Sequence, residues 1–156
     1  MRRSDREITD FDRMIEIMRQ CDVCRLAIND GEYPYIVPLN FGMTVNERQV
    51  KLYFHGATEG TKLDLIAKNP RVSFEMDCAH ELMLIEEGKN CTMNYESVIG
   101  RGIARILPED EKYDALTAIM RHYRAESFGI NEAVIPHTAA IELTVESMTA
   151  KERKGR

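Results

Sequence analysis

The sequence predicts an α+β protein that is mainly β, in which roughly six antiparallel strands form a small closed barrel with about three peripheral helices. Short runs of alternating apolar and polar residues are typical of strands, and turn-forming dipeptides such as Asp30-Gly31 separate neighbouring runs. Only a few segments show helical spacing, so most strands must be joined by hairpins. This favours a barrel over a doubly wound parallel sheet.

The first elements follow from local patterns. Apolar residues recur at helical spacing from Ile8 to Met18, which predicts an amphipathic helix over residues 9–20 with Thr9 as its N-cap. Three strand-like runs follow it. Because Asp30-Gly31 favours a tight turn, we expect them to form a three-stranded antiparallel meander, and they read "VCRLAIN", "YPYIVPLNFGM" and "QVKLYFH".

The second half of the chain continues the alternation. A short helix over residues 58–68 should stop at Asn69-Pro70, because a residue before proline disfavours the helical conformation. "RVSFEM" and "ESVIGRGIARIL" predict strands, the second with a bulge or a close backbone approach at Gly100 and Gly102. Pro108 opens a helix, and "AAIELTVESMTAK" predicts the closing strand.

Length and charge limit the function classes. A chain of 156 residues fits one domain, expected over residues 1–150, with a disordered basic tail over 151–156. The composition, 44% hydrophobic and 30% charged, is that of a globular protein, and the formal net charge of −5 provides no basic field for nucleic acid. A charged N-terminus and the absence of a long apolar run predict no signal peptide and no membrane helix, hence a cytoplasmic location.

The four cysteines allow one alternative. Cys21 and Cys24 form a C-x-x-C pair, and with Cys78 and either Cys91 or His80 they could supply four zinc ligands. The pair lies between an expected helix and an expected strand, where Cys24 continues the strand pattern as a small core residue. A thioredoxin-like redox motif requires the opposite order of elements. A zinc-stabilised interaction protein is therefore a third-ranked hypothesis.

The stretch "FHGATEGTK", residues 54–62, joins an expected strand to an expected helix. Gly56 and Gly60 let the backbone approach a ligand closely, and Lys62 adds a positive charge in the first turn, where backbone N–H groups lack internal partners. The spacing is not that of a P-loop. The stretch is either a phosphate cradle or a capped turn with a solvated lysine.

Five segments, one of which contains this stretch, follow in order along nearly the whole chain: "MRRSDREI", "GEYPYIVPLNFG", "LYFHGATEGTKLDLI", "NPRVSFE" and "YESVIGRGIARIL". Together they resemble the flavin-binding split-barrel proteins of the pyridoxamine 5′-phosphate oxidase-like superfamily, most closely the nitroimidazole-resistance (Nim-type) branch. The resemblance implies a six-stranded antiparallel split β-barrel. It also implies FMN at a homodimer interface, with the phosphate in the strand-to-helix loop and the ring along strands from both subunits.

Carried over residue by residue, the resemblance implies three groups of FMN-binding residues. The phosphate and ribityl group comprises His55, Gly56, Ala57, Gly60 and Lys62, the ring group comprises Val37, Pro38, Leu39 and Asn40, and a third group approaching the ring comprises Ser97 and Val98. A strand can offer backbone N–H and C=O groups to a flavin, and Pro38 suits a strand edge.

The resemblance does not extend to the pyridoxamine phosphate site, whose residues are not recognisable here. His55 is the catalytic candidate, either donating to a phosphate or ribityl oxygen or facing the substrate; Arg2 and Arg3 could add charge to the phosphate site. The leading function is an FMN-dependent oxidoreductase that takes electrons from a reduced nicotinamide and reduces a small nitroaromatic acceptor. The alternative is a non-catalytic flavin- or haem-binding module, with haem needing an axial histidine.

Overall fold

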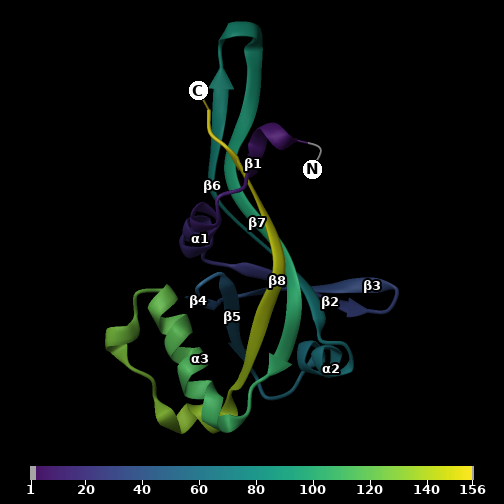
Figure 1. Ribbon diagram of the computed structural model, residues 1–156, viewed down its shortest axis with the longest axis vertical. Helices are drawn as coiled ribbons and strands as arrows, with labels where there is room; N and C mark the ends of the chain where they lie inside the picture. Colours follow the sequence, from purple (N-terminus) through teal and green to yellow (C-terminus); the bar gives the residue numbers. More distant parts are fainter. Residues whose placement is uncertain (1–2, 156) are drawn as a thin grey trace.

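One antiparallel sheet organises the molecule (Figure 1). The computed structural model describes residues 3–155 of the chain. The eight-stranded sheet has the order β3-β2-β6-β7-β8-β5-β4, with β1 paired to β8. The strands are β1 (Glu7–Ile8), β2 (Cys24–Asp30), β3 (Tyr33–Leu39), β4 (Gly42–Asn46), β5 (Gln49–Gly56), β6 (Arg71–Ile85), β7 (Asn90–Ile106) and β8 (Ala139–Arg153). Within residues 3–155, β3 and β4 end the order and do not pair with each other. The α+β split barrel is confirmed, but the sheet does not close and has eight strands rather than six.

The expected three-stranded meander is wrong, because its middle strand is two strands. β3 pairs with β2, whereas β4 pairs with β5 at the other end of the sheet. The break falls at Asn40 and Phe41. Phe41 is fully buried, and its backbone N–H donates to the hydroxyl of Tyr123 at 3.2 Å instead of joining a strand ladder. A side chain 82 residues away therefore redirects the chain here.

Three α-helices lie on the sheet: α1 (Phe11–Gln20), α2 (Thr61–Lys68) and α3 (Glu109–His122). The N-cap of α1 is Asp10 rather than Thr9, since the Asp10 carboxylate accepts from the backbone N–H of Asp12 at 2.8 Å. The end of α2 before Asn69 and the start of α3 after Pro108 are as predicted. Short 3₁₀ segments are η1 (Ser4–Arg6), η2 (Glu87–Lys89), η3 (Glu126–Phe128) and η4 (Glu132–His137).

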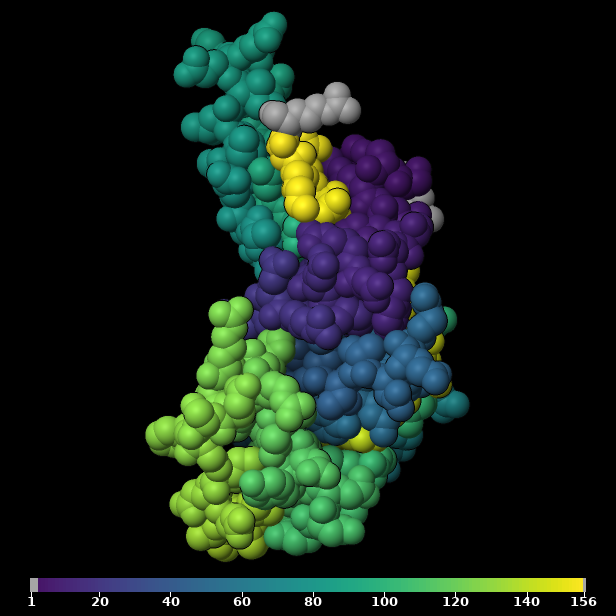
Figure 2. Space-filling view, turned by 60° about the vertical axis from the view of Figure 1, so that its left-hand side comes forward, coloured from purple at the N-terminus to yellow at the C-terminus, as the bar shows by residue number. Residues whose placement is uncertain are grey.

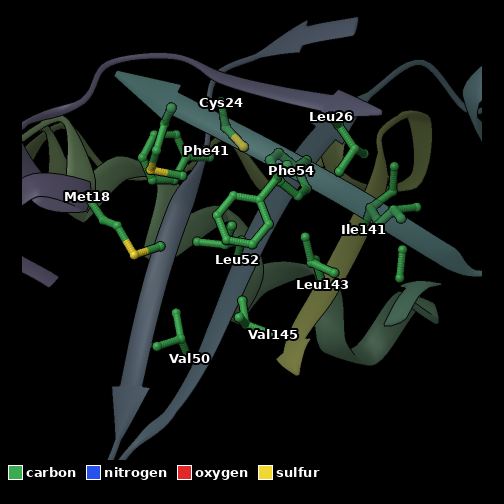
Figure 3. Close-up of a cluster of buried hydrophobic side chains, with 14 of the residues drawn as sticks. Met18, Cys24, Leu26, Phe41, Val50, Leu52, Phe54, Ile141, Leu143 and Val145 are labelled. Carbon is green, nitrogen blue, oxygen red and sulfur yellow. The ribbon is translucent and has the colours of Figure 1, made fainter. Parts of the chain in front are cut away.

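The main core fills the concave side of the sheet. Figure 3 shows Leu52 and Phe54 of β5 and Leu143 of β8 pointing to the same interior as Met18 of α1 and Phe41. All five side chains are fully buried, and burying each large apolar side chain contributes on the order of 1.5–3 kcal/mol. A smaller cluster on the other face joins Tyr53, Leu107 and Ala140 to α3, so the first residues of β8 are buried on both faces.

The β6–β7 hairpin extends beyond the rest of the sheet and projects from it (Figure 1). Its inner part has the backbone irregularity that the glycines predict. The register shifts between Arg101 and Gly102, and a Cβ on Gly102 would clash with the carbonyl oxygen of Thr144 on β8. The close backbone approach expected at this position is therefore present.

The basic tail begins later than expected, because β8 continues to Arg153. Lys151 pairs with Ser97 of β7 and with Glu7 of β1. Beyond the strand, the Lys154 ammonium lies 3.3 Å from the buried carboxylate of Glu96. The expectation of disorder from residue 151 is wrong because these partners are distant along the chain and do not register in local composition.

Candidate functional site

The loop between β5 and α2 forms a small cradle of backbone. Gly60 is the N-cap of α2 and has φ +133°, a conformation that favours glycine. Its carbonyl accepts from the N–H of Leu63 at 2.9 Å and from that of Asp64 at 3.3 Å. No side chain caps α2, so the N–H groups of its first turn are not engaged by a capping side chain. Such a helix start attracts an anion.

Lys62 folds back over Gly56. A Cβ added to Gly56 would lie 2.7 Å from the Nζ atom of Lys62 and 2.9 Å from its Cε atom. A side chain at position 56 would therefore require the flexible end of the Lys62 side chain to move. Among residues 3–155 the structure gives Lys62 no ion-pair partner, although its side chain is half-buried. The Lys62 ammonium, without an ion-pair partner in the described residues, thus lies above the loop and beside a helix start that no side chain caps. A solvated turn does not require this arrangement.

His55 lies at the end of strand β5, and its side chain points away from the core. It alternates with the fully buried Phe54 and lies opposite Ala140 of β8. Its ring is exposed, and no hydrogen bond to it is found in the described part of the chain. Ala57, two residues further along the chain, is also exposed. The five predicted residues thus lie along the junction of β5 and α2: His55 and Gly56 end the strand, Ala57 is in the loop, Gly60 is the N-cap, and Lys62 is in the first turn of the helix.

The predicted ring group lies on β3, at an edge of the sheet. Val37 and Leu39 are half-buried, whereas Pro38 is exposed and opposite Arg25 of β2. Because β3 has no second neighbour within residues 3–155, one side of its backbone is unpaired. Pro38, which lacks an N–H, is at an edge as expected.

Asn40 follows this strand and is held by the end of α3. Its Nδ2 group donates to the hydroxyl of Tyr123 at 3.2 Å and lies 3.4 Å from the carbonyl of Asp22. The Tyr123 hydroxyl itself donates to the Asp22 carbonyl at 2.6 Å. Tyr123 is thus a positioning residue that sequence reasoning missed, because nothing local marks a tyrosine just beyond a helix as a partner of Asn40.

Ser97 and Val98 lie far from the loop within one chain. Leu107 of the β7 end donates its N–H to Ala140, which in turn is opposite His55. Ser97 is ten residues before Leu107, and ten residues of extended strand span roughly 33 Å. Val98 is fully buried in the core. The loop and Ser97 of the same chain therefore cannot contact the same small cofactor group.

A charged network lies on the outer face near His55. Glu142 of β8 is only 5% exposed, and its carboxylate accepts from Arg105 Nε at 2.9 Å and from Lys51 Nζ at 3.1 Å. Burial raises the pKa of Glu142, but the hydrogen bonds from Arg105 and Lys51 outweigh it, so the pKa lies below its ordinary value. The available sequence signal is a glutamate within the apolar run "AAIEL".

The remaining sequence candidates do not form a second site. Between residues 3 and 155 no three or more His, Cys, Asp or Glu side chains are grouped so as to hold a metal. Burial raises the pKa of both Cys21 and Cys24, which keeps them as thiols.

Of the two N-terminal arginines, Arg3 lies far from the loop of its own chain. Arg2 lies outside the described residues. Arg3 forms a bidentate ion pair with Asp5, at 2.8 Å and 2.6 Å. Glu7, which follows, pairs near Lys151, whereas Gly56 pairs with Ala139 at the other end of β8, roughly 40 Å away along the strand.

An incomplete antiparallel barrel with peripheral helices defines the protein as a split-barrel protein. The pyridoxamine 5′-phosphate oxidase family model matches residues 10–152, so the chain belongs to that family. No curated protein matches the sequence. Among residues 3–155, none of the helices has the length and apolar character to cross a membrane.

Solved structures agree with this fold. The chain is 32% identical to a proposed 5-nitroimidazole antibiotic resistance protein from Bacteroides thetaiotaomicron, covering 94% of this chain and 86% of that one with a TM-score of 0.80. An FAD and haem binding protein from Mycobacterium smegmatis is 17% identical, with coverage of 96% and 74% and a TM-score of 0.82. The flavocytochrome Anf3 from Azotobacter vinelandii is 18% identical, with coverage of 99% and 72% and a TM-score of 0.81. The last two similarities concern the fold alone.

Proposed function

We propose that the protein is an FMN-dependent oxidoreductase that reduces a small nitroaromatic compound with electrons from a reduced nicotinamide. The observation that carries the FMN assignment is Lys62 folded over Gly56 at the uncapped start of α2. A terminal phosphate needs both a positive charge and free N–H donors, and this loop supplies both. The 32% identity to the proposed nitroimidazole resistance protein supports the choice of acceptor.

The residues fit the cofactor in two parts. The loop residues His55, Gly56, Ala57, Gly60 and Lys62 would hold the phosphate and the ribityl chain. The ring would lie along the open edge of β3, against Val37, Pro38, Leu39 and Asn40, where the backbone polar groups have no partner strand. Ser97 and the backbone of Val98 would approach the ring from a second chain.

The same geometry supports a homodimer. Because Ser97 lies about 33 Å along the sheet from the loop, a site that uses both must take them from different chains. The chain also exposes 9974 Å². A compact monomer of 18.0 kDa exposes about 8,000 Å², so roughly 1,900 Å² is in excess, comparable to what one subunit buries in a large interface. Exposed Leu82, Leu84 and Met93 on the projecting hairpin supply apolar surface for such an interface.

FMN held by these residues would supply two-electron redox chemistry, so that a hydride from the nicotinamide and a proton from solvent together reduce a nitro group to a nitroso compound and water. The protein's own residues bind and orient. Lys62 neutralises phosphate charge, and Tyr123 fixes Asn40 against the ring edge. His55 is an exposed titratable side chain beside the loop. A hydrogen-bond donor to the cofactor, or a proton donor to the acceptor, would have to face outward in this way.

The test is to titrate the purified protein with FMN and then to add a reduced nicotinamide anaerobically. We expect one FMN per chain, bleaching of the flavin absorbance, and its recovery when a 5-nitroimidazole is added. A protein that takes up no FMN refutes the proposal. FMN that binds but stays oxidised instead supports the alternative of a non-catalytic flavin-binding module, and uptake of haem in place of FMN supports a haem-binding module.

A further inference from the structure

Three arginines converge on a groove that the proposed FMN site does not use. Arg19 comes from the last turn of α1, whereas Arg121 and Arg124 come from the end of α3 and the turn after it. Met43, Thr44 and Val45 of β4 and His122 complete the lining, and the volume is about 510 Å³. Figure 2 shows α1, β4 and the end of α3 adjoining on one face of the molecule. This volume is in the range of small-molecule sites.

The charges in this groove are not compensated by the protein. Within residues 3–155, Arg19, Arg121 and Arg124 form no ion pair with a carboxylate, and the lining contains no acidic residue. Some other arginines are paired with carboxylates, as Arg105 is with Glu111 and Glu142. An arginine near the end of a helix is favoured by the helix dipole. That effect accounts for each arginine separately but not for three cations that face one hollow in a chain with net charge −5.

The groove is held in shape by neutral contacts. The His122 ring lies 4.1 Å from the Phe41 ring, centroid to centroid, and its Nε2 atom is 2.7 Å from the Cys21 carbonyl. Arg124 has φ +55°, and its N–H donates to the Arg121 carbonyl at 3.0 Å. The arginines therefore project from anchored backbone, which lowers the entropy lost when an anion binds.

The groove adjoins the ring end of the proposed flavin site. Tyr123 lies between His122 and Arg124 in sequence, and its hydroxyl contacts the amide of Asn40 and the N–H of Phe41. The loop with Lys62, by contrast, is formed at the other end of β5 from the β4–β5 turn. A ligand with phosphates in the groove would thus approach the ring from the side opposite the FMN phosphate.

We propose that this groove binds the pyrophosphate and the 2′-phosphate of NADPH and gives the enzyme a preference for NADPH over NADH. The identity of the ligand rests on the proposed function, whereas the affinity for nucleotide phosphates does not. Guanidinium groups bind phosphate through paired hydrogen bonds, and an arginine is the usual partner of a 2′-phosphate. Three of them match the extra phosphate of NADPH better than the pyrophosphate of NADH alone.

The binding test uses adenosine 2′,5′-bisphosphate, which carries the 2′-phosphate and no redox chemistry, and isothermal titration calorimetry. We expect Arg121→Gln to weaken it about tenfold and Arg19→Gln/Arg124→Gln about a hundredfold. Arg71→Gln is the matched control, since Arg71 is exposed, forms no ion pair within residues 3–155 and lies outside the groove. Equal binding by all variants, or equal loss in the control, overturns the inference. So does inorganic pyrophosphate binding as tightly as the bisphosphate, because the groove would then be a general anion patch.

The kinetic test separates this inference from the proposed function. With FMN-loaded protein, the arginine variants should raise KM for NADPH about tenfold or more, leave kcat nearly unchanged, and raise KM for NADH less. Flavin reduction by NADPH with the same KM in all variants overturns the groove assignment and leaves the oxidoreductase intact. Bisphosphate binding that depends on the arginines, in a protein that takes up no FMN, supports the groove and refutes the oxidoreductase. Thermal melting that matches wild type excludes misfolding as the cause.

Discussion

The Lys62 ammonium occupies the space above Gly56 that any side chain at position 56 would need, 2.7 Å from where its Cβ would be. The two residues come from different elements, Gly56 from the end of β5 and Lys62 from the first turn of α2. Their contact brings the charge of the loop and its open backbone together. Loop function therefore depends on both, and each can be tested separately.

Lys62→Ala should weaken FMN by about 1.5–3 kcal/mol, which is on the order of ten- to a hundredfold, because a charge-assisted hydrogen bond to the phosphate is lost. The fold should persist, since a lysine in the first turn opposes the helix dipole. Fluorescence titration measures the affinity. Riboflavin is the control because it lacks the phosphate, and it should bind wild type and variant equally. Equal loss of riboflavin and FMN would contradict the phosphate contact.

Gly56→Ala should displace Lys62 and weaken FMN about tenfold, because the new Cβ takes the place of the ammonium. In Lys62→Ala, by contrast, the same change should cost little, as its clash partner is gone. The two substitutions should therefore be non-additive in a double-mutant cycle of FMN binding. Strictly additive effects would mean that Gly56 serves the backbone alone and not the path of Lys62.

Mixed dimers test whether two chains share each site. When Lys62→Ala subunits are mixed with Ser97→Leu subunits, both substitutions fall in one site and leave the other site wild type. We expect one high-affinity FMN per mixed dimer, although both parent homodimers bind weakly. If Ser97 served no site, Ser97→Leu would bind FMN as wild type does. If Ser97 served the site of its own chain, mixing would restore no high-affinity binding.

The Glu142 network should make stability depend on acid. A carboxyl group whose pKa is lower in the folded chain than in the unfolded chain stabilises the fold above the unfolded value, and that contribution disappears as the pH falls through the folded value. For Glu142 the loss should occur below the ordinary carboxyl value of 4.5. Urea unfolding against pH should therefore show a smaller loss of stability on acidification in Glu142→Gln than in wild type. An identical pH dependence would contradict the network's role.

Replacing Arg105, a cation of this network, should lower the free energy of unfolding more than replacing Glu111, its exposed anion. Arg105→Met leaves the buried Glu142 carboxylate with Lys51 alone and should cost roughly 1–3 kcal/mol, less than a fully buried pair because Arg105 is half-exposed. Glu111→Gln is the matched control, since Glu111 binds the same arginine from the surface, and it should change stability little. Equal effects in thermal unfolding would place the stabilising charge at the surface.

Tyr123→Phe tests the link between the end of α3 and Asn40, the residue that follows β3. The substitution removes the hydroxyl that accepts from the Phe41 N–H and holds Asn40, so we expect a loss of about 1–2 kcal/mol in the free energy of unfolding. FMN and riboflavin should weaken alike, because Asn40 is assigned to the ring rather than to the phosphate. Tyr113→Phe, at an exposed position on α3, is the control and should leave both quantities unchanged.

The sequence alone determined the features whose causes are local. The end of α2 at Asn69, the start of α3 after Pro108 and the close approach at Gly102 were all predictable, because proline and glycine act on the backbone within a few residues. The composition of the β5–α2 loop also identified Gly56 and Lys62 as candidates for an anion site, since strand, loop and helix are consecutive in the chain.

Only the tertiary structure decided the features whose causes are distant in the chain. The end of the strand pairing at Phe41 depends on Tyr123, and the place of Lys151 within β8 depends on its pairing with Ser97 and Glu7. Strand pairing is a choice among partners of similar pattern, and burial and packing make that choice rather than local propensity. The same reason hid the arginine groove. Arg19 belongs to α1, whereas Arg121 and Arg124 belong to the end of α3 and the turn after it about a hundred residues later, and only the tertiary fold brings them to one groove.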